Sequence, residues 1–192
     1  MQERPSVKRL VLSGLLVAAG VLLSGALSIP AFPLGVYSIK IGFGMLPVIL
    51  AGILFGPIYG GMVGGLTDLL QALLFPRGAF VPWFTIAAVF FGLIPGLYFI
   101  KKQKPTLPRL LFAVGSGQVF GSVICNTLIM VFVYGLPLTV ILPLRIVNQA
   151  IMIPLYAIIL YWILPRLKGF NTLSKPKETP SLGSKDSKEQ AE

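Results

Sequence analysis

Apolar residues occur in six long runs along this chain, and Pro, Gly and basic residues gather in the short segments between them. Hydropathy and these helix-breaking residues predict membrane-spanning helices at residues 10–29, 41–55, 58–75, 83–100, 110–134 and 146–164. The second run is shorter than the roughly 20 residues that a helix needs to cross a bilayer. We therefore expect it to form a tight hairpin with the third run, with the turn Phe55-Gly56-Pro57 at the membrane interface.

The segments between the runs differ in their content of Lys and Arg, and this difference predicts the orientation of the chain. If both termini lie in the cytoplasm, thirteen basic residues fall on the inner side, and only Lys40, Arg77 and Arg145 fall outside. Membrane proteins show this excess of positive charge in their cytoplasmic loops. The bias also accounts for the net charge of +10, without a nucleic acid partner. The predicted fold class is an all-α membrane protein with six transmembrane helices and cytoplasmic N- and C-termini.

The composition supports a chain whose solvent is lipid. Hydrophobic residues make up 55% of it and charged residues 11%, and the mean hydropathy is +0.86, which is too apolar for the core of one soluble domain. Six crossings use most of the 192 residues. We expect residues 1–170 to form a single transmembrane substrate-binding domain. Residues 171–192 are rich in Ser, Lys, Pro and Glu, so we expect a disordered cytoplasmic tail.

The residues that catalysis would need are scarce. The chain has no His and a single Cys, Cys125, so we expect no metal and no cofactor. Of the six acids only Asp68 lies in a predicted span, so no pair of carboxylates is available for acid and base chemistry. No phosphate-binding loop of an ATPase is present. We predict a binding protein rather than an enzyme. The alternative is a stand-alone ion-coupled carrier of a small organic solute, although the halves show no convincing repeat.

Two stripes of small residues at four-residue spacing would let helices approach closely in lipid. Gly14 and Ala18 form one stripe in the first span. Gly56, Gly60 and Gly64 form the other, at the start of the third span. We interpret the second stripe as internal packing. For the first, packing and a partner-docking face are equally consistent with the spacing.

Asp68 is expected in the outer half of the third span, with Gln71 one turn further out on the same face. A carboxylate in lipid needs a partner or a wet cavity. The cations on the outer side are Lys40, Arg77 and Arg145. We favour a structural role in which Asp68 pairs with one of them, and direct contact with a ligand is the alternative.

Aromatic and amide side chains gather near the predicted outer ends of the spans. An aromatic belt at the interface would explain the rings, but rings, amides and one Arg are also what a small planar ligand needs. Buried amides demand hydrogen-bond partners, and Gln118 and Asn126 are about two helical turns apart, on one side of the fifth span. The candidate substrate-binding residues are Tyr37, Phe80, Trp83, Phe84, Phe91, Gln118, Asn126, Arg145, Asn148 and Gln149.

Four segments of the sequence resemble the folate-family S components of energy-coupling factor (ECF) vitamin transporters. They are residues 44–57 (GMLPVILAGILFGP), 68–78 (DLLQALLFPRG), 82–85 (PWFT) and 92–96 (GLIPG). The similarity covers nearly the whole chain except the tail. It implies a six-helix subunit in a prokaryotic cell membrane that captures a vitamin at the outer face. It also implies docking of the first helix, through Gly14 and Ala18, on a transmembrane coupling protein driven by two ATPases.

The sequence departs from the family at two positions that bear on the ligand. Folate-binding members tend to carry an Arg near the end of the first helix and another in the fourth, where this chain has Gly25 and Phe91. Folate presents carboxylates, so the loss of two cations counts against folate itself and in favour of a less anionic, related heteroaromatic compound, and both are kept as candidate ligands.

Overall fold

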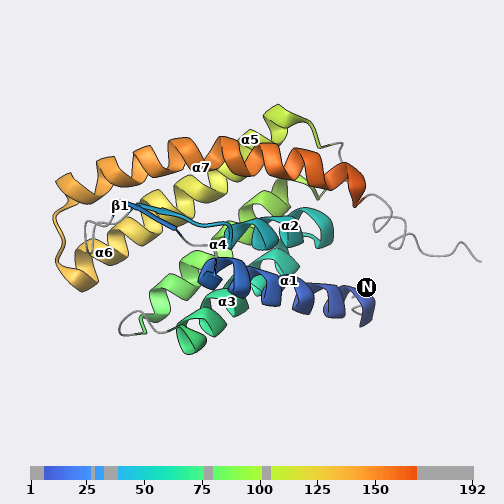
Figure 1. Ribbon diagram of the computed structural model, residues 1–192, viewed down its shortest axis with the longest axis horizontal. Helices are drawn as coiled ribbons and strands as arrows, with labels where there is room; N and C mark the ends of the chain where they lie inside the picture. Colours follow the sequence, from blue (N-terminus) through green and yellow to red (C-terminus); the bar gives the residue numbers. More distant parts are fainter. Residues whose placement is uncertain (1–6, 27–28, 33–38, 76–79, 101–104, 168–192) are drawn as a thin grey trace, which may run out of the picture.

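The computed structural model describes residues 7–26, 29–32, 39–75, 80–100 and 105–167, and these residues form a bundle of helices (Figure 1). Within them the helices are α1 (Val7–Ala26), α2 (Met45–Phe55), α3 (Pro57–Leu74), α4 (Pro82–Tyr98), α5 (Leu107–Gln118), the π-helix η2 (Val119–Asn126), α6 (Thr127–Tyr134) and α7 (Leu138–Arg166). The segments α5, η2 and α6 are continuous, so the described residues contain six helical rods. The predicted helical fold is confirmed.

The structure differs from the sequence prediction at the ends of three rods. The first helix ends at Ala26 rather than residue 29, and the second begins at Met45 rather than residue 41. Between them, strands β1 (Ile29–Phe32) and β2 (Ile39–Ile41) form a short antiparallel pair. Pro30 cannot donate a helical backbone hydrogen bond, so this apolar stretch takes an extended form although its hydropathy continues that of the helix.

The largest difference concerns the last helix, which begins at Leu138 rather than residue 146. Arg145, which the sequence analysis placed outside the last span, lies inside α7. The prediction that Arg145 belongs to an outer loop is therefore wrong, because the bundle supplies hydrogen-bond partners for its guanidinium group.

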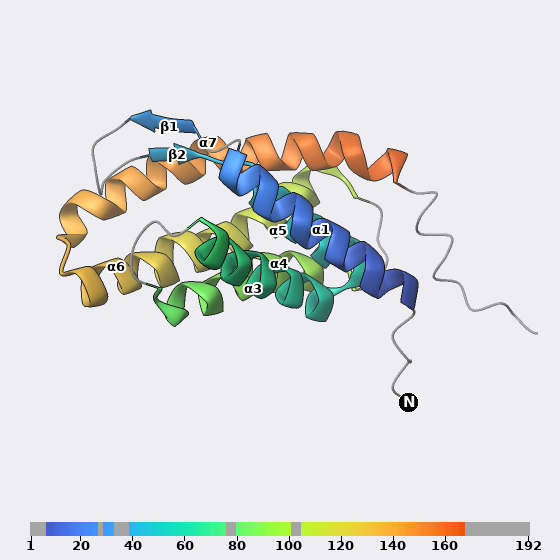
Figure 2. The same ribbon diagram turned by 60° about the horizontal axis from the view of Figure 1, so that its bottom comes forward.

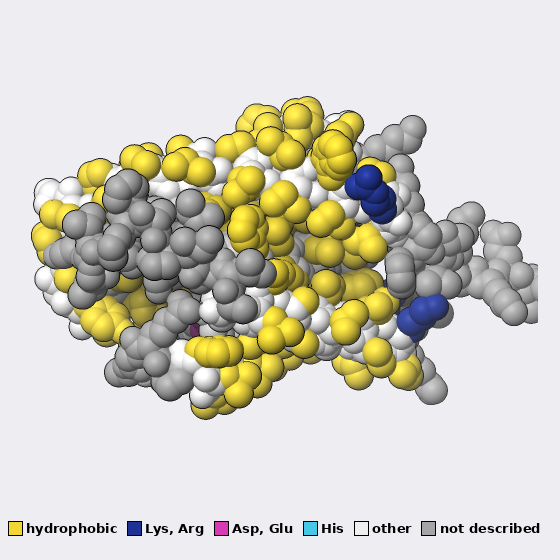
Figure 3. Space-filling model, in the orientation of Figure 1, with side chains coloured by type: hydrophobic (Ala, Val, Ile, Leu, Met, Phe, Trp, Pro, Cys, Tyr) yellow, Lys and Arg dark blue, Asp and Glu magenta, His cyan; other side chains and the backbone are white. Residues whose placement is uncertain are grey.

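The surface of the bundle is apolar, as a lipid environment requires. Three helices are long and apolar enough to cross a membrane, at residues 7–25, 107–134 and 138–166, and α2 and α4 are apolar but shorter. Large side chains such as Val11, Leu15 and Phe132 are mostly exposed on the outside of the bundle. Figure 3 shows hydrophobic side chains over much of the described part of one face, and the Lys and Arg side chains visible there lie toward one end. The start of α1 and the end of α7 lie at the same end of the bundle (Figures 1 and 2).

Glycines bring α2, α3 and α4 into backbone contact. A Cβ atom on Gly60 would collide with the backbones of Gly92 and Gly52, and one on Gly64 would collide with the carbonyl of Ala88. Gly56 has a φ of 100° and links α2 to α3 as the predicted tight turn. Gly60 and Gly64 are thus internal packing, as predicted, whereas nothing lies within 4 Å of a Cβ built on Gly56, which serves the turn.

This packing predicts opposite effects for the same substitution at two glycines. Gly60→Ala should lower the stability of the bundle by about 1–3 kcal/mol, because backbone atoms cannot move aside for the methyl group. The matched control is Gly14→Ala, where nothing lies within 4 Å and Ala favours a helix. Thermal unfolding in detergent measures both, and equal midpoints for the two variants would contradict the packing described here.

Candidate functional site

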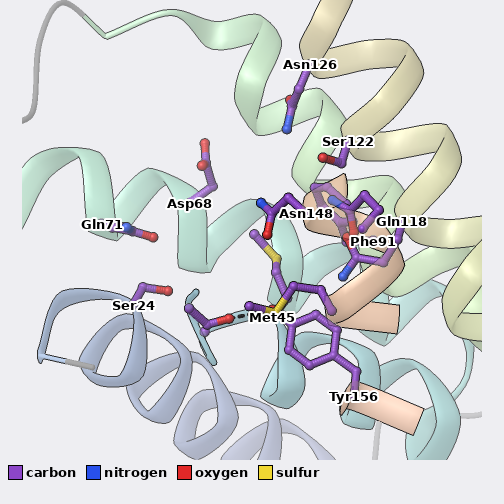
Figure 4. Close-up of a pocket in the computed structure, with 14 residues that line it drawn as sticks. Ser24, Met45, Asp68, Gln71, Phe91, Gln118, Ser122, Asn126, Asn148 and Tyr156 are labelled. Atoms are coloured by element: carbon purple, nitrogen blue, oxygen red, sulfur yellow. Dashed lines mark hydrogen bonds between the residues drawn. The ribbon is translucent and has the colours of Figure 1, made fainter. Parts of the chain in front are cut away.

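A cavity of about 310 Å³ lies inside the bundle, toward the end where α1 and α3 finish and α2 begins. Residues of all six rods line it. Figure 4 shows the polar ends of Ser24, Gln71, Asn126 and Asn148 directed into one space, with Asp68 at its border. The lining residues are Ser24, Gly42, Gly44, Met45, Asp68, Gln71, Phe91, Gln118, Ser122, Asn126, Asn148, Gln149, Met152 and Tyr156.

The π-helix places three polar side chains of one rod along the cavity. Gln118, Ser122 and Asn126 are four residues apart and all line it. In an α-helix, residues at this spacing are offset by about 40° around the axis. The wider turn of a π-helix contains more residues, so positions four apart lie closer to one line. The π-helical geometry of η2 thus brings these three hydrogen-bonding side chains closer to one line along the rod.

An aromatic wall closes one side of the cavity. Phe91 is only 4% exposed, and a Cβ on Gly121 would meet its ring, so the ring packs directly on the backbone of η2. The neighbouring rings of Phe90 and Phe120 pack edge to face, with centroids 4.9 Å apart. Phe91 therefore combines packing between α4 and η2 with a ring that faces the cavity.

Non-helical backbone forms another side. Gly42 and Gly44, which precede α2, line the cavity, and the Tyr156 hydroxyl donates a hydrogen bond to the carbonyl of Gly42. A side chain on Gly44 would collide with Ser24 of α1. Irregular backbone within a membrane protein is tolerated where it is buried in protein or lines a cavity, and Gly42 and Gly44 line this one.

Two amide oxygens in the site have no protein partner among the described residues. They are Oδ1 of Asn126 and Oε1 of Gln149, and Gln149 is only 8% exposed. Each belongs to a residue that lines the cavity. An unsatisfied buried amide costs about 1–3 kcal/mol, so such groups indicate a place where a bound molecule supplies the missing hydrogen bonds.

The two charged candidates have different positions. Arg145 does not line the cavity: its guanidinium donates to the carbonyl and hydroxyl oxygens of Ser122, at 3.2 and 3.1 Å, and to the sulfur of Met130 at 3.1 Å. These contacts join η2 and α6 to α7. Asp68 does line the cavity, and within the described part of the chain its carboxylate accepts a hydrogen bond from Thr85, at 2.8 Å, rather than pairing with Arg145.

Half of the ten residues predicted to bind the substrate meet at this cavity, namely Phe91, Gln118, Asn126, Asn148 and Gln149. Phe80 and Trp83 lie at the start of α4 outside the lining, and both are mostly exposed. Phe84 also lies outside it, with its ring centroid 6.5 Å from that of Tyr134. Tyr37 falls outside the described residues. Gly14 and Ala18, the predicted docking pair, are both exposed on α1.

Several lining residues were not predicted but share a helix face with residues that were. Ser122 lies midway between Gln118 and Asn126, and Met152 and Tyr156 follow Asn148 at intervals of four. Extending the four-residue period from each predicted amide would have found all three. No comparable signal marks Ser24, Gly42, Gly44 or Met45, because the close approach of α1 and the start of α2 depends on the tertiary fold.

Comparisons with known proteins agree with this architecture. Residues 8–164 match the family described as ECF transporter, substrate-specific component. The folate transporter FolT of Clostridium novyi (strain NT) is 38% identical over 140 residues, which are 71% of this chain and 81% of the relative.

Two solved structures share the fold. A crystal structure of FolT bound with folic acid gives a TM-score of 0.70 at 28% identity, and the match covers 82% of this chain and 93% of that one. The S component of a bacterial ECF transporter gives 0.61 at 26% identity, with 88% and 99% covered. The resemblance inferred from the sequence is confirmed. The family consists of transporter components, so no enzymatic role is expected of the chain.

The amide oxygen of Gln149, which lacks a partner among the described residues, should lower the stability of the ligand-free protein. Gln149→Met keeps the size of the side chain and removes the unpartnered oxygen, so the protein stripped of bound small molecules should become more stable by about 1–3 kcal/mol. Gln71→Met is the matched control, because Gln71 lines the same cavity but is half-exposed. Thermal unfolding without added ligand measures both. A less stable Gln149→Met protein would show that the amide already has a partner.

Proposed function

Because the chain belongs to the substrate-specific components of ECF transporters, we propose that it captures a vitamin of the folate class at the outer face of a prokaryotic cell membrane. Uptake would be driven by ATP through partner subunits, and both termini of this chain would be cytoplasmic. The observation that carries the proposal is the polar cavity with two amide oxygens that lack a partner among the described residues, within a chain 38% identical to a folate transporter over 140 residues. The family membership disfavours the alternative of a stand-alone ion-coupled carrier.

The size and lining of the cavity suit a planar heteroaromatic ring. Its volume of about 310 Å³ is at the small end of the range for ligand pockets. Phe91 and Tyr156 supply aromatic surface, and the amides and hydroxyls supply hydrogen bonds around it. A pteridine ring, which has both flat faces and polar edges, uses both kinds of group.

The charge of the lining bears on which part of the ligand it holds. Among the described residues that line the cavity there is one carboxylate, Asp68, and neither Lys nor Arg. At the two departures from the family pattern, Gly25 lies against the ring of Phe75, and Phe91 packs on Gly121. A lining of this kind recognises a ring rather than the glutamate carboxylates of folate.

We therefore predict that the glutamate portion of folate contributes little to affinity. The purified protein should bind folic acid, and pteroic acid, which lacks the glutamate, should bind within about tenfold of it, since no cation in the lining pairs with the missing carboxylates. Isothermal titration calorimetry measures both constants. A loss of about 100-fold or more for pteroic acid would place cations at the ligand from outside this lining. Absence of binding by either compound would overturn the proposed ligand class.

The exposed face of α1 suits a partner helix. Gly14 and Ala18 are exposed, nothing lies within 4 Å of a Cβ on Gly14, and Val11 and Leu15 beside them are more than 60% exposed. Small residues allow the backbone of a second helix to approach closely in lipid. We propose that this face docks on a transmembrane coupling protein that works with two ATPases.

Bulky residues on this face should prevent assembly with the partner subunits and leave ligand affinity nearly unchanged. Gly14→Trp with Ala18→Trp should abolish co-purification with a co-expressed coupling protein and its ATPases, because a large ring prevents close helix contact. Folic acid affinity should change less than threefold. Ala150→Trp, at an exposed small residue of α7, is the matched control and should assemble normally. Normal assembly of the double variant would refute the docking face, and a joint loss of folding and binding would show that the stripe serves packing.

A further inference from the structure

Asp68 combines three features that the transport function alone does not explain. It borders the cavity, it is the single carboxylate among the described lining residues, and Thr85 of α4 holds it in place. A carboxylate within a membrane protein is costly unless it is paired or hydrated, so a residue of this kind marks a functional contact by default. The question is which molecule completes its hydrogen bonding.

The Thr85 bond uses part of the capacity of the carboxylate. The hydroxyl donates to Oδ2 at 2.8 Å, which fixes the side chain of α3 from the neighbouring α4. An ionised carboxylate offers about four acceptor sites on its two oxygens. Because Asp68 lines the cavity, the remaining sites are available to a molecule inside it.

The other polar side chains of the cavity do not determine whether the ligand must donate or accept hydrogen bonds, whereas Asp68 can. The amide oxygens of Asn126 and Gln149 lack a partner among the described residues, and an amide can present either its oxygen or its NH₂ group. The hydroxyl of Ser122 can likewise donate or accept. When ionised, the carboxylate accepts only, so the atoms of a ligand that face the ionised form of Asp68 must be donors.

We propose that Asp68 is the residue that selects the ligand ring, by accepting two hydrogen bonds from adjacent donors on a planar heterocycle. A ring N–H beside an exocyclic amino group provides such a pair, with the spacing that lets a guanidinium bind a carboxylate through two parallel bonds. Amino-oxo pteridines, including the ring of folic acid, carry this edge. The proposal rests on the proposed function, and it identifies the edge of the ligand ring that Asp68 binds.

This role is tested by measuring two ligands, with and without the donor group, against the protein with and without the Asp68 carboxylate. Binding of folic acid and of its analogue lacking the exocyclic amino group is measured by calorimetry for the wild-type protein and for Asp68→Asn. The wild-type protein should prefer folic acid by about 100-fold, because a site built to hydrogen-bond a donor rejects a ligand that lacks it. In Asp68→Asn the preference should fall to about threefold or less, through weaker binding of folic acid and unchanged binding of the analogue.

Thr85→Val is the matched control, because it removes the neighbour and keeps the carboxylate. It should retain most of the preference. If Asp68→Asn does not fold, Asp68→Glu, which keeps the charge but moves it, should reduce the preference by at least tenfold. Equal binding of the two ligands by the wild-type protein, or an intact preference in Asp68→Asn, would overturn the role of Asp68 and leave the proposed function standing. No folic acid binding by the wild-type protein would overturn both.

Discussion

The backbone contact between Gly52, Gly60 and Gly92 determines how the first half of the bundle is built. These glycines lie near the end of α2, near the start of α3 and past the middle of α4, so the three helices are held together at one end. In lipid there is no hydrophobic force to bring helices together, and close packing of small residues takes its place. The cavity lies toward the other end, where Met45 begins α2 and Gln71 nears the end of α3. Phe91, next to Gly92, lines the cavity beside the crossing.

The second half supplies most of the hydrogen-bonding groups, and it does so through a departure from regular α-helix. In η2 the carbonyl of Ser122 accepts bonds from the Thr127 hydroxyl and from Arg145. The charged group thus holds a widened helical turn, and Gln118, Ser122 and Asn126 of the same rod line the cavity. A π-helix inside an α-helical rod often accompanies a functional site, and here its consequence is the alignment of polar side chains.

The sequence predicted the helices better than the site, for a physical reason. Long apolar runs are needed wherever a helix meets lipid, so the rods could be located from hydropathy, while the extended segment near Pro30 and the early start of α7 could not. Buried amides were good indicators of the cavity, because Asn148 and Gln149 need partners wherever they are enclosed. Aromatic residues were poor indicators, because Trp83 meets the needs of a membrane interface equally well and is 60% exposed. The lining by Asp68 and the Thr85 contact depend on how α3 crosses α4, which no local pattern encodes.

Helix α1 connects the cavity with the proposed docking face. Ser24 lines the cavity, and Gly14 lies ten residues earlier, about 15 Å along the axis, on an exposed side. Between them, Gly20 packs against Thr67 of α3 and close to the backbone of Gly44, at the cavity wall. A rigid helix moves as a unit, so a ligand that contacts Ser24 and a partner that contacts Gly14 and Ala18 act on one body. Under the proposed function, the ligand and the partner therefore both act on the position of α1 relative to α3. The small residue at position 20 sets how closely these two helices approach.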